Sequence, residues 1–484
     1  MKTLNDLFPN LRDVFGSEGD SIINSVVCDP REATYGSLFA VFQKDLDKEI
    51  ALVQNATLNG SRFMLREKGE KQVAEVFGAN GIIFINTPNA RMELARVCSE
   101  FRKNNFKNIA AVTGTNGKSS TVHICNQIWN LCGIKSASIG TLGVMTKNSQ
   151  VPVALTTPDA PHLVHIFNEL DRKGIQNIAI EASSHGLAQH RLDCTKLSVC
   201  AFTNFTQDHL DYHGTFERYW QAKERLFSEL ADLDTVFVIN ADDPQSERIF
   251  EVAHRRNIRY IDYGKNAQDI KLVSCKQVGN HQRVSVEYYE REVEFDLPLT
   301  GYFQVYNALC AAGICYVTGF HLKTIFECFD KLKPIDGRLE LVGTNVYIDY
   351  AHTPDALKNA LISLREYTSG KLRLVFGCGG ERDHGKRKIM GEIANRLADE
   401  IIVTDDNPRG ESPDEIREMI LEGCPNAEEI PDRATAIQTA ISKLEPTDIL
   451  LVAGKGHEDY QILADETIHF SDREVVRKAL GLKK

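Results

Sequence analysis

The sequence predicts an α/β protein of three domains, in which mostly parallel sheets are covered by helices. Three observations indicate this fold class. The chain has 484 residues, 42% of them hydrophobic and 25% charged, which at about 150 residues per domain corresponds to roughly three globular cores. From residue 108 onward, apolar runs of strand length alternate with helix-length segments, the pattern of βαβ units. A polar stretch and a stretch with proline and glycine interrupt this pattern, and domain boundaries are expected there.

The first two domains are expected over residues 1–105 and 106–333. The first contains short apolar runs at 38–42 and 82–85 and ends in a polar candidate linker at 102–105. The second is expected to be a parallel sheet of the phosphate-loop type. After a Gly279-Asn280 turn, alternating apolar and polar residues predict a small antiparallel addition within about 269–297. The parallel strands of the second domain are expected at 109–112, 178–180, 197–202 and 236–239.

The third domain is expected over residues 334–484, with a Rossmann-like fold. Pro334 and Gly337 interrupt the pattern, and a fresh series of strands then alternates with helical segments. These strands are expected at 346–349, 372–376, 401–404 and 449–452.

Charge and composition exclude several classes of protein. The net charge is −11, without a long basic block, so a surface that neutralises a nucleic acid backbone is not expected. No signal peptide and no apolar run near the ~18 residues of a membrane span is present, and we expect a cytoplasmic monomer without a membrane partner. The twelve cysteines include no C-x-x-C pair, which favours reduced packing residues.

The segment 109–125 predicts a phosphate-binding loop between a strand and a helix. Gly114 and Gly117 let backbone amides approach a polyphosphate, Lys118 can reach the β- and γ-phosphates, and Ser119 can place a hydroxyl on magnesium. The usual G-x-x-x-x-G-K-[ST] spacing is not met, because Val112 stands where the first glycine belongs. An ordinary strand-to-helix turn is the alternative.

A second polar cluster is expected at the carboxyl edge of the same sheet, where open α/β sheets bind ligands. Glu181 ends one predicted strand, and a carboxylate near a phosphate loop can bind magnesium. His209 and His213 follow the next strand; a zinc pair or solvated loop histidines are alternatives. From the residues alone, Lys223 is an exposed helical lysine.

A third cluster is predicted in the last domain, where three apolar strands each lead into a polar loop containing glycine. In a parallel sheet these loops emerge at one edge and can converge on one ligand. The composition suits a zwitterion: Asp406 and Glu458 for ammonium groups, Arg382 and Arg409 for carboxylates. The alternative for the D-N-P-R segment at 406–409 is a solvent-exposed turn.

The motif G-T-N-G-K-S-S at 114–120 resembles the shortened phosphate loop of the Mur ligase family, the ATP-dependent amide-forming enzymes that build the peptidoglycan peptide. The resemblance extends from about residue 27 to the carboxyl terminus. Two motifs depart from the family pattern: Gln304 replaces an asparagine, and Pro30 and Ser37 replace a serine and an aspartate in the uridine-binding segment.

The resemblance implies four groups of site residues. ATP contacts are implied for Gly114, Thr115, Asn116, Gly117, Lys118, Ser119, Ser120, Asn307, Arg338 and Asp349. A Mg²⁺ site is implied at Ser119, Glu181, His209 and a carbamylated Lys223, and Lys118, Glu181, His209 and Lys223 are the implied catalytic residues. Contacts to UDP-N-acetylmuramoyl-L-alanyl-D-glutamate are implied for Asp29, Arg31, Thr156, Thr157, Ser183, Gln189 and Arg191. Amino-acid contacts are implied for Arg382, Asp406, Asn407, Pro408, Arg409, Gly454 and Glu458.

The implied reaction activates the D-glutamate carboxylate as an acyl phosphate, which an amine then attacks. The segment 406–409 resembles the motif of family members that add meso-diaminopimelate. Arg409 would bind the carboxylate that lysine lacks, an interaction worth about 1.5–3 kcal/mol. A lysine-adding or folylpolyglutamate-type ligase stays open as an alternative, as does a nucleotide-dependent switch. An inactive scaffold is disfavoured by the reactive groups retained at 114–120, 181–185 and 406–409.

Overall fold

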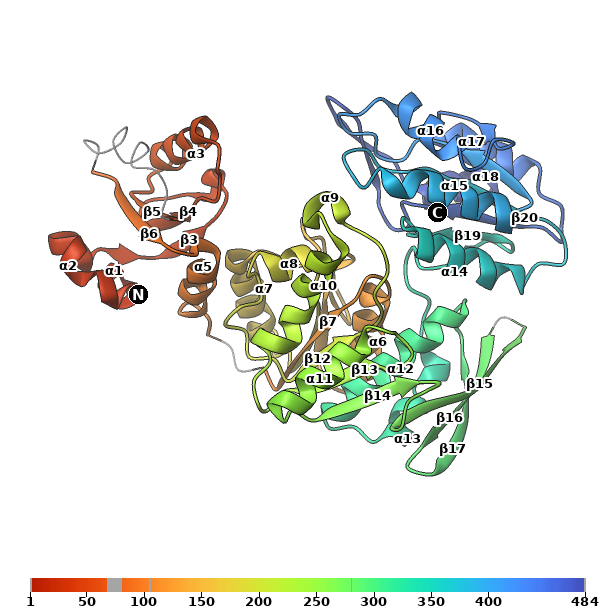
Figure 1. Ribbon diagram of the computed structural model, residues 1–484, viewed down its shortest axis with the longest axis horizontal. Helices are drawn as coiled ribbons and strands as arrows, with labels where there is room; N and C mark the ends of the chain where they lie inside the picture. Colours follow the sequence, from red (N-terminus) through yellow and green to blue (C-terminus); the bar gives the residue numbers. More distant parts are fainter. Residues whose placement is uncertain (1, 68–80, 104–105, 280, 483–484) are drawn as a thin grey trace.

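The structure is a computed structural model that describes residues 2–67, 81–103, 106–279 and 281–482. Its three main sheets are mostly parallel and covered by helices, which confirms the α/β fold class. Figure 1 shows three bodies, with the amino-terminal one at one end of the long axis and the carboxyl-terminal one at the other. Asn104 and Asn105 of the expected linker and Asn280 of the expected turn lie outside the described residues.

The amino-terminal body is a four-stranded parallel sheet with the order β3-β4-β5-β6. Both faces are covered, because buried side chains of the sheet belong to two separate apolar clusters. The strands are β3 (Ser25–Val27), β4 (Ser37–Ala40), β5 (Phe63–Glu67) and β6 (Ile83–Thr87), and the longer helices are α3 (Leu46–Leu58) and α5 (Ala90–Ser99). Before this sheet lie β1 (Lys2–Thr3), α1 (Leu4–Leu7), α2 (Arg12–Phe15) and β2 (Ile22–Ile23).

The central body is an eleven-stranded sheet with the order β10-β9-β8-β11-β7-β12-β13-β14-β15-β16-β17. Its inner strands are parallel and buried at almost every residue, as expected for a sheet covered on both faces. They are β7 (Asn108–Thr113), β8 (Ser136–Gly140), β11 (Asn177–Glu181), β12 (Val199–Phe202), β13 (Val236–Asn240) and β14 (Tyr260–Gly264). The short strands β9 (Gly143–Thr146) and β10 (Gln150–Val151) extend one edge as antiparallel strands.

The expected antiparallel addition is present at the other edge of this sheet. It consists of β15 (Ile270–Val278), β16 (His281–Tyr288) and β17 (Arg291–Leu297), which pair in antiparallel register. Its buried residues, including Val284 and Val286, join the core of the central body. The addition is therefore part of the central fold.

Helices cover both faces of the central sheet. On one face pack α6 (Lys118–Leu131), α12 (Tyr302–Val317) and α13 (Leu322–Phe326). On the other face pack α7 (Ala160–Arg172), α8 (Ser184–Ala188), α10 (Phe216–Arg225) and α11 (Ser246–Arg256). The short helix α9 (Leu210–His213) lies above α10 in Figure 1. No helix in the described part of the chain is long and apolar enough to cross a bilayer, and the twelve cysteines are all free, most of them buried.

The carboxyl-terminal body is a six-stranded sheet with the order β18-β19-β23-β20-β21-β22, parallel except for β18. Its strands are β18 (Glu340–Val342), β19 (Val346–Asp349), β20 (Leu372–Phe376), β21 (Glu400–Val403), β22 (Glu428–Glu429) and β23 (Ile449–Ala453). One face packs on α14 (Pro354–Arg365), α15 (Gly385–Leu397) and α16 (Pro413–Leu421), the other on α17 (Arg433–Ser442) and α18 (Asp472–Ala479). A hairpin of β24 (Tyr460–Ile462) and β25 (Thr467–His469) follows β23.

Candidate active site

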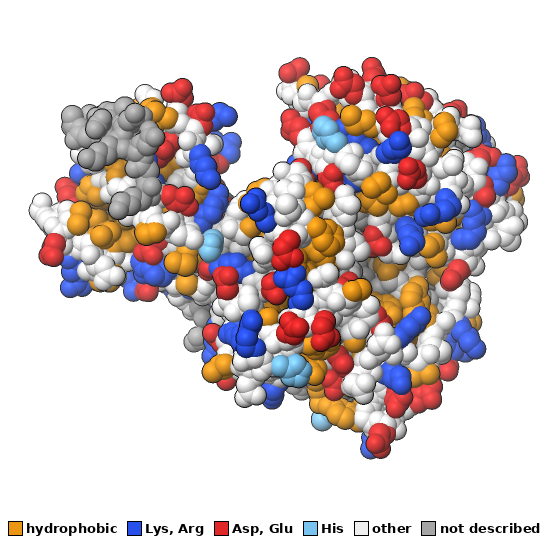
Figure 2. All heavy atoms as spheres, viewed as in Figure 1, with side chains coloured by type: hydrophobic (Ala, Val, Ile, Leu, Met, Phe, Trp, Pro, Cys, Tyr) orange, Lys and Arg blue, Asp and Glu red, His pale blue; other side chains and the backbone are white. Residues whose placement is uncertain are grey.

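A cavity of about 400 Å³ lies at the carboxyl edge of the central sheet. Its walls come from the loops after β7, β8, β11, β12 and β13, from α12, and from the start of the carboxyl-terminal body. Figure 2 shows the open notch between the outer bodies above the central one. Many of the expected site residues line this cavity: Thr115, Asn116, Gly117, Lys118, Ser119, Ser120, Thr156, Glu181, Ser183, His209, Lys223, Asn307, Arg338 and Asp349.

The phosphate loop turns tightly from β7 into α6. Gly117 has a φ of +86°, and a side-chain carbon there would lie 2.3 Å from Oδ1 of Asn307, so only glycine fits. Lys118 begins the helix, and its Nζ donates to the carbonyl oxygens of Gly114 (2.9 Å) and Thr115 (2.8 Å). The lysine is thus folded over its own loop, beside amides that can receive phosphate oxygens.

Lys223 is buried in this site, which corrects the expectation of an exposed helical lysine. The inward face of α10 carries Tyr219, Trp220 and Lys223, so helical spacing directs the lysine toward the phosphate loop. Its side chain is 1% exposed, and Nζ donates to the carbonyl oxygen of Gly114 at 2.7 Å. Burial and the neighbouring Lys118 hold the pKa of Lys223 well below its usual value. Burial therefore favours the neutral amine over the charged form in the unmodified side chain.

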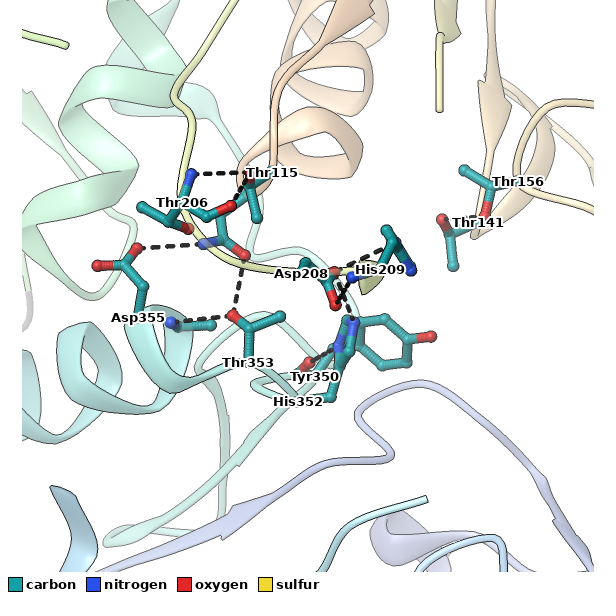
Figure 3. A network of polar contacts seen from close by, with 12 residues as sticks. Thr115, Thr141, Thr156, Thr206, Asp208, His209, Tyr350, His352, Thr353 and Asp355 are labelled. Carbon is teal, nitrogen blue, oxygen red and sulfur yellow. Dashed lines mark hydrogen bonds and ion pairs between the residues drawn. The ribbon is translucent and has the colours of Figure 1, made fainter. Parts of the chain in front are cut away.

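Glu181 ends β11 at the cavity wall and is held by Thr141. The backbone N–H of Thr141 donates to Oε1 of Glu181 (2.8 Å), and its hydroxyl donates to Oε2 (3.3 Å). Thr141 also contacts Thr156 through their hydroxyl groups at 3.2 Å, as Figure 3 shows. The carboxylate is 1% exposed and keeps a fixed orientation toward the cavity.

Asp208 orients His209 beside this carboxylate. Nε2 of His209 lies 3.1 Å from Oδ2 of Asp208, and His352 approaches the same oxygen at 4.0 Å (Figure 3). Burial lowers the pKa of His209 to about 2, so the ring is neutral. A neutral imidazole has a lone pair on one ring nitrogen that can bind a cation.

The zinc alternative finds no support in this geometry. Nε2 of His213 is buried without a hydrogen-bond partner, and the ring packs beside His185 and Tyr219. Within the described residues, no group of three or more His, Cys, Asp or Glu side chains is arranged to hold a metal ion.

Arg338 crosses from the carboxyl-terminal body to the phosphate loop. Its Nη2 donates to Oγ of Ser119 at 2.8 Å, and its guanidinium lies over the ring of Tyr350. Asp349 is buried at the same wall, and burial raises its pKa to about 6. Gln304, the departure from the family pattern, accepts a hydrogen bond from the amide of Asn307 and so supports that residue.

A second, smaller cavity of about 120 Å³ lies between the amino-terminal and central bodies. Gln189 and Arg191 line it, and Arg191 donates to Oε1 of Gln189 and to the carbonyl oxygen of Thr157, each at 2.7 Å. The Thr157 hydroxyl lies 2.9 Å from that of Ser183. Asp29 and Arg31 line neither cavity and pair with each other instead, with Arg31 largely exposed.

The three loops of the carboxyl-terminal body do converge. The amide of Asn407 donates to Oε2 of Glu458 at 3.0 Å, and a side-chain carbon at Gly454 would lie 2.6 Å from Oδ2 of Asp406. Arg409 has a φ of +53° and donates to the carbonyl oxygens of Gly380 and Asn407. Pro408 packs against Gly380 in the first loop.

Arg382 and Arg409 have no ion pair among the described residues. Arg382 donates to the carbonyl oxygen of Glu381. Burial, followed by the charge of Arg382, lowers the pKa of Arg409. Two guanidinium groups that disfavour each other electrostatically form a good site for an anion.

Comparisons with known proteins agree with this geometry. Residues 112–315 match the Mur ligase middle domain, and residues 337–456 match the Mur ligase glutamate ligase domain. The UDP-N-acetylmuramoyl-L-alanyl-D-glutamate--2,6-diaminopimelate ligase of Agrobacterium fabrum is 42% identical over 98% of this chain and 96% of its own length. The chain belongs to the Mur ligase family. The ligase of the same name from Zymomonas mobilis is also 42% identical to this Mur ligase, over 93% of this chain and 96% of its own.

Solved structures resemble this Mur ligase over most of its length. A structure of UDP-N-acetylmuramoyl-L-alanyl-D-glutamate--2,6-diaminopimelate ligase has a TM-score of 0.69 and 29% identity and covers 99% of both chains. The MurF ligase from Thermotoga maritima, in complex with ADP, has a TM-score of 0.64 and 17% identity, covering 95% of this chain and 97% of its own. At that identity the second likeness concerns the fold alone.

Three residues of the Mur ligase site were not among the predicted ones. Asp208 is adjacent to His209, and this pairing was the signal that could have identified it. His352 lies two residues before the proline that starts α14, in a loop selected only for Asp349. Thr141 carried no signal, because it follows β8, whose sequence Ser-Ala-Ser-Ile-Gly lacks the apolar run of a predictable strand.

Proposed function

We propose that this Mur ligase joins meso-diaminopimelate to UDP-N-acetylmuramoyl-L-alanyl-D-glutamate with ATP as the energy source. The observation that carries the proposal is Arg409, whose guanidinium lies near that of Arg382 and has no ion pair among the described residues. A second carboxylate distinguishes diaminopimelate from lysine, and an arginine can bind it in a bidentate manner. The names of the relatives at 42% identity support the same substrates.

ATP is proposed to bind in the larger cavity. Residues 114–120 would receive its phosphates on backbone amides at the start of α6, where the helix dipole favours negative charge. On ATP binding, the Lys118 ammonium group would donate to phosphate oxygens in place of the two loop carbonyl oxygens. Arg338 would likewise donate to the phosphates in place of the Ser119 hydroxyl. Asn307 and Asp349 line the same cavity.

The donor set fits a magnesium ion that shares its coordination with substrate phosphates. Mg²⁺ is usually held by one or two carboxylates plus phosphates and waters, and Glu181, His209 and Ser119 supply a carboxylate, a neutral imidazole and a hydroxyl at the cavity wall. The bound ion would neutralise charge on the transferred phosphoryl group. The lowered pKa of Lys223 supports its carbamylation, because it increases the fraction of neutral amine, the form that reacts with CO₂ to give an oxygen ligand.

The muramoyl dipeptide is proposed to enter from the smaller cavity toward Glu181. Arg191 and Gln189 would lie along its peptide, with Thr156, Thr157 and Ser183 nearer the reacting carboxylate. Asp29 and Arg31 stay candidates for the uridine end, although they would first have to release each other.

The chemistry is proposed to proceed in two steps. A carboxylate oxygen of D-glutamate attacks the γ-phosphorus of ATP, which releases ADP and gives an acyl phosphate. The neutral amine of diaminopimelate then attacks the acyl carbon, the tetrahedral adduct expels phosphate, and the amine loses its proton as the amide forms. Lys118 stabilises negative charge on the transferred group in the first step.

We also propose domain boundaries at 1–105, 106–333 and 334–484. The main apolar clusters of the central and carboxyl-terminal bodies are separate and support the second boundary, whereas the amino-terminal cluster also includes Ala160 and Val164 of α7. We also propose a monomer, and the consumption of ATP supports a cytoplasmic location.

Phosphate release, measured with each substrate omitted in turn, tests the proposal. A ligase requires ATP, the muramoyl dipeptide and the amino acid together, whereas a nucleotide-dependent switch hydrolyses ATP without the other two. Mass spectrometry of products made with meso-diaminopimelate or with lysine distinguishes the two amide ligases. Product with lysine alone would overturn the proposed role of Arg409.

A further inference from the structure

Lys455 is a buried lysine in the loop that follows β23, and no role has been assigned to it so far. Its side chain is fully buried, which is rare for lysine unless the charge is paired. Gly454 and Gly456 on either side have φ values of +116° and +56°. Side-chain carbons at these two positions would collide with Asp406 and Tyr350, so the loop backbone packs tightly around the lysine.

The Lys455 side chain connects two of the expected amino-acid contacts. Its Nζ donates to Oδ1 of Asn407 at 3.1 Å and to Oε2 of Glu458 at 3.2 Å. Asn407 in turn donates from Nδ2 to the same oxygen of Glu458 at 3.0 Å. The three side chains therefore form a closed triangle, with one member from the D-N-P-R loop and two from the loop after β23.

One oxygen of Glu458 stays available within this triangle. Lys455 and Asn407 both bind Oε2, whereas the contact described for Oε1 is a long one of 3.5 Å, from the Tyr350 hydroxyl. An ammonium group of a ligand can therefore approach Oε1 without displacing the lysine.

The charges around Glu458 explain why a lysine is needed. Burial raises the pKa of this carboxyl, the nearby Asp406 raises it further, and Lys455 opposes both. Two more cations face the cluster: Arg409, and Arg433, which is already paired with Asp472. Tyr460 packs beside Lys455 and Glu458. In the part of the chain that the structure describes, Lys455 is the cation that forms an ion pair with the Glu458 carboxylate.

We propose that Lys455 is a positioning residue that fixes the Asn407 amide and keeps Glu458 ionised, so that Oε1 can bind an ammonium group of the incoming amino acid. The inference rests on the proposed function, because it assumes that this loop receives a zwitterion. Removing one member of a buried ion pair leaves an uncompensated charge. Without Lys455 the carboxyl would be protonated more easily, and its protonated form would lose the attraction for the ammonium group.

The test is steady-state kinetics of the full-length enzyme with meso-diaminopimelate and ATP varied separately. Lys455→Met should raise the KM for diaminopimelate by about tenfold or more, the range expected when a buried charge loses its partner. The KM for ATP should change by less than about twofold, since the phosphate loop belongs to a different sheet. The rise should be larger at pH 6 than at pH 8, because Glu458 in the variant is then more protonated.

Three further variants keep the test decisive if Lys455→Met folds poorly. Lys455→Arg retains the charge and should keep the KM for diaminopimelate closer to that of wild type than Lys455→Gln does. The double variant Lys455→Met/Glu458→Gln should raise the KM by less than the product of the two single effects, because the lysine acts partly through the glutamate. Lys443→Met, at an exposed lysine paired with Glu428 in the same body, is the matched control and should behave as wild type.

The outcomes separate the two proposals. If wild type forms no product with diaminopimelate, the proposed function is wrong and the role of Lys455 is lost with it. If wild type forms product but a folded Lys455→Met or Lys455→Gln shows an unchanged KM for diaminopimelate, the inference alone is overturned. Equal increases in both KM values, or fully additive effects in the double variant, would overturn it as well.

Discussion

Arg409 combines an unusual backbone conformation with an unpaired guanidinium. A φ of +53° at a residue with a side chain costs of order 1–3 kcal/mol, and the surrounding contacts hold it: Pro408 packs against Gly380, and the guanidinium donates to two carbonyl oxygens. Such conformations concentrate at ligand sites. The strain at Arg409 thus supports its role in amino-acid binding independently of its charge.

Replacing Arg409 by alanine should therefore affect one substrate selectively. Loss of charge-assisted hydrogen bonds worth about 1.5–3 kcal/mol predicts a rise of about tenfold to about a hundredfold in the KM for diaminopimelate, with the KM for ATP nearly unchanged. Steady-state kinetics with each substrate varied gives the comparison. Arg396→Ala, an exposed arginine of α15, serves as control; equal changes in both KM values for Arg409→Ala would contradict its role.

Lys223 should reduce the stability of the unmodified protein in a pH-dependent way. Its pKa in the folded state lies well below the usual value, so the unfolded chain binds the proton more tightly. The free energy of unfolding therefore decreases as the pH falls below about 10.5 toward the folded-state pKa.

Lys223→Met removes this proton linkage and keeps most of the apolar stem. In CO₂-free buffer its Tm should exceed that of wild type by a few degrees at pH 7, and the gain should shrink at pH 10. Thermal unfolding at both pH values measures the difference, with the exposed Lys173→Met as control. If the Tm difference between Lys223→Met and wild type increased from pH 7 to pH 10, the proposed proton linkage would be contradicted.

At the scale of elements, the turn from β7 into α6 depends on the close approach of Gly117 to Asn307 on α12. Gly117→Ala should weaken ATP binding, since its new carbon would displace Asn307. Gly133, just after α6, is a matched control because it has a similar φ of +82° but nothing within 4 Å.

Both alanine variants carry the same backbone strain, of about 1 kcal/mol. Only Gly117→Ala should raise the KM for ATP, by about tenfold or more if the loop shifts. Chemical denaturation gives the stability cost of each variant and kinetics gives the ATP effect. Matching KM values for the two variants would show that the contact with Asn307 is unimportant.

The strands with continuous apolar runs were predictable from the sequence, and so were the loops that follow them. β13 and β23 are examples, because strands buried on both faces carry nearly continuous apolar runs. The sequence did not predict the elements and side chains whose burial depends on contacts with distant segments. β8 consists of small residues, and Lys223 is buried because α10 turns its charged position toward another loop. No local pattern records such contacts between distant segments.

At the scale of the whole molecule, one hydrogen bond connects the amino-acid loop with the wall that holds Glu181. Nε2 of His457 donates to the carbonyl oxygen of Thr141 at 3.2 Å, and Thr141 in turn binds Glu181. Burial lowers the pKa of His457 to about 4, so the ring is neutral near pH 7 and the contact should not depend on pH there.

His457→Ala should loosen the arrangement of the central and carboxyl-terminal bodies. We expect kcat to fall by about fivefold to about tenfold, because one hydrogen bond contributes about 1 kcal/mol and that free energy corresponds to a rate change of this size. Small-angle X-ray scattering should show a larger radius of gyration for the free variant than for wild type. His469→Ala, at an exposed histidine of the same body, is the control; unchanged kcat and radius for His457→Ala would refute this coupling.

Lys118 follows a strand of the central sheet, and Arg409 follows a strand of the carboxyl-terminal sheet. Each sheet has its own apolar core. Energy conversion and the choice of amine are consequently separable in protein engineering. A library restricted to residues 377–384, 405–411, 454–456 and 458–459, with His457 kept, would sample new amines while the nucleotide site keeps its native packing. By the same reasoning, an inhibitor that binds only to the loops of the carboxyl-terminal body should not displace ATP.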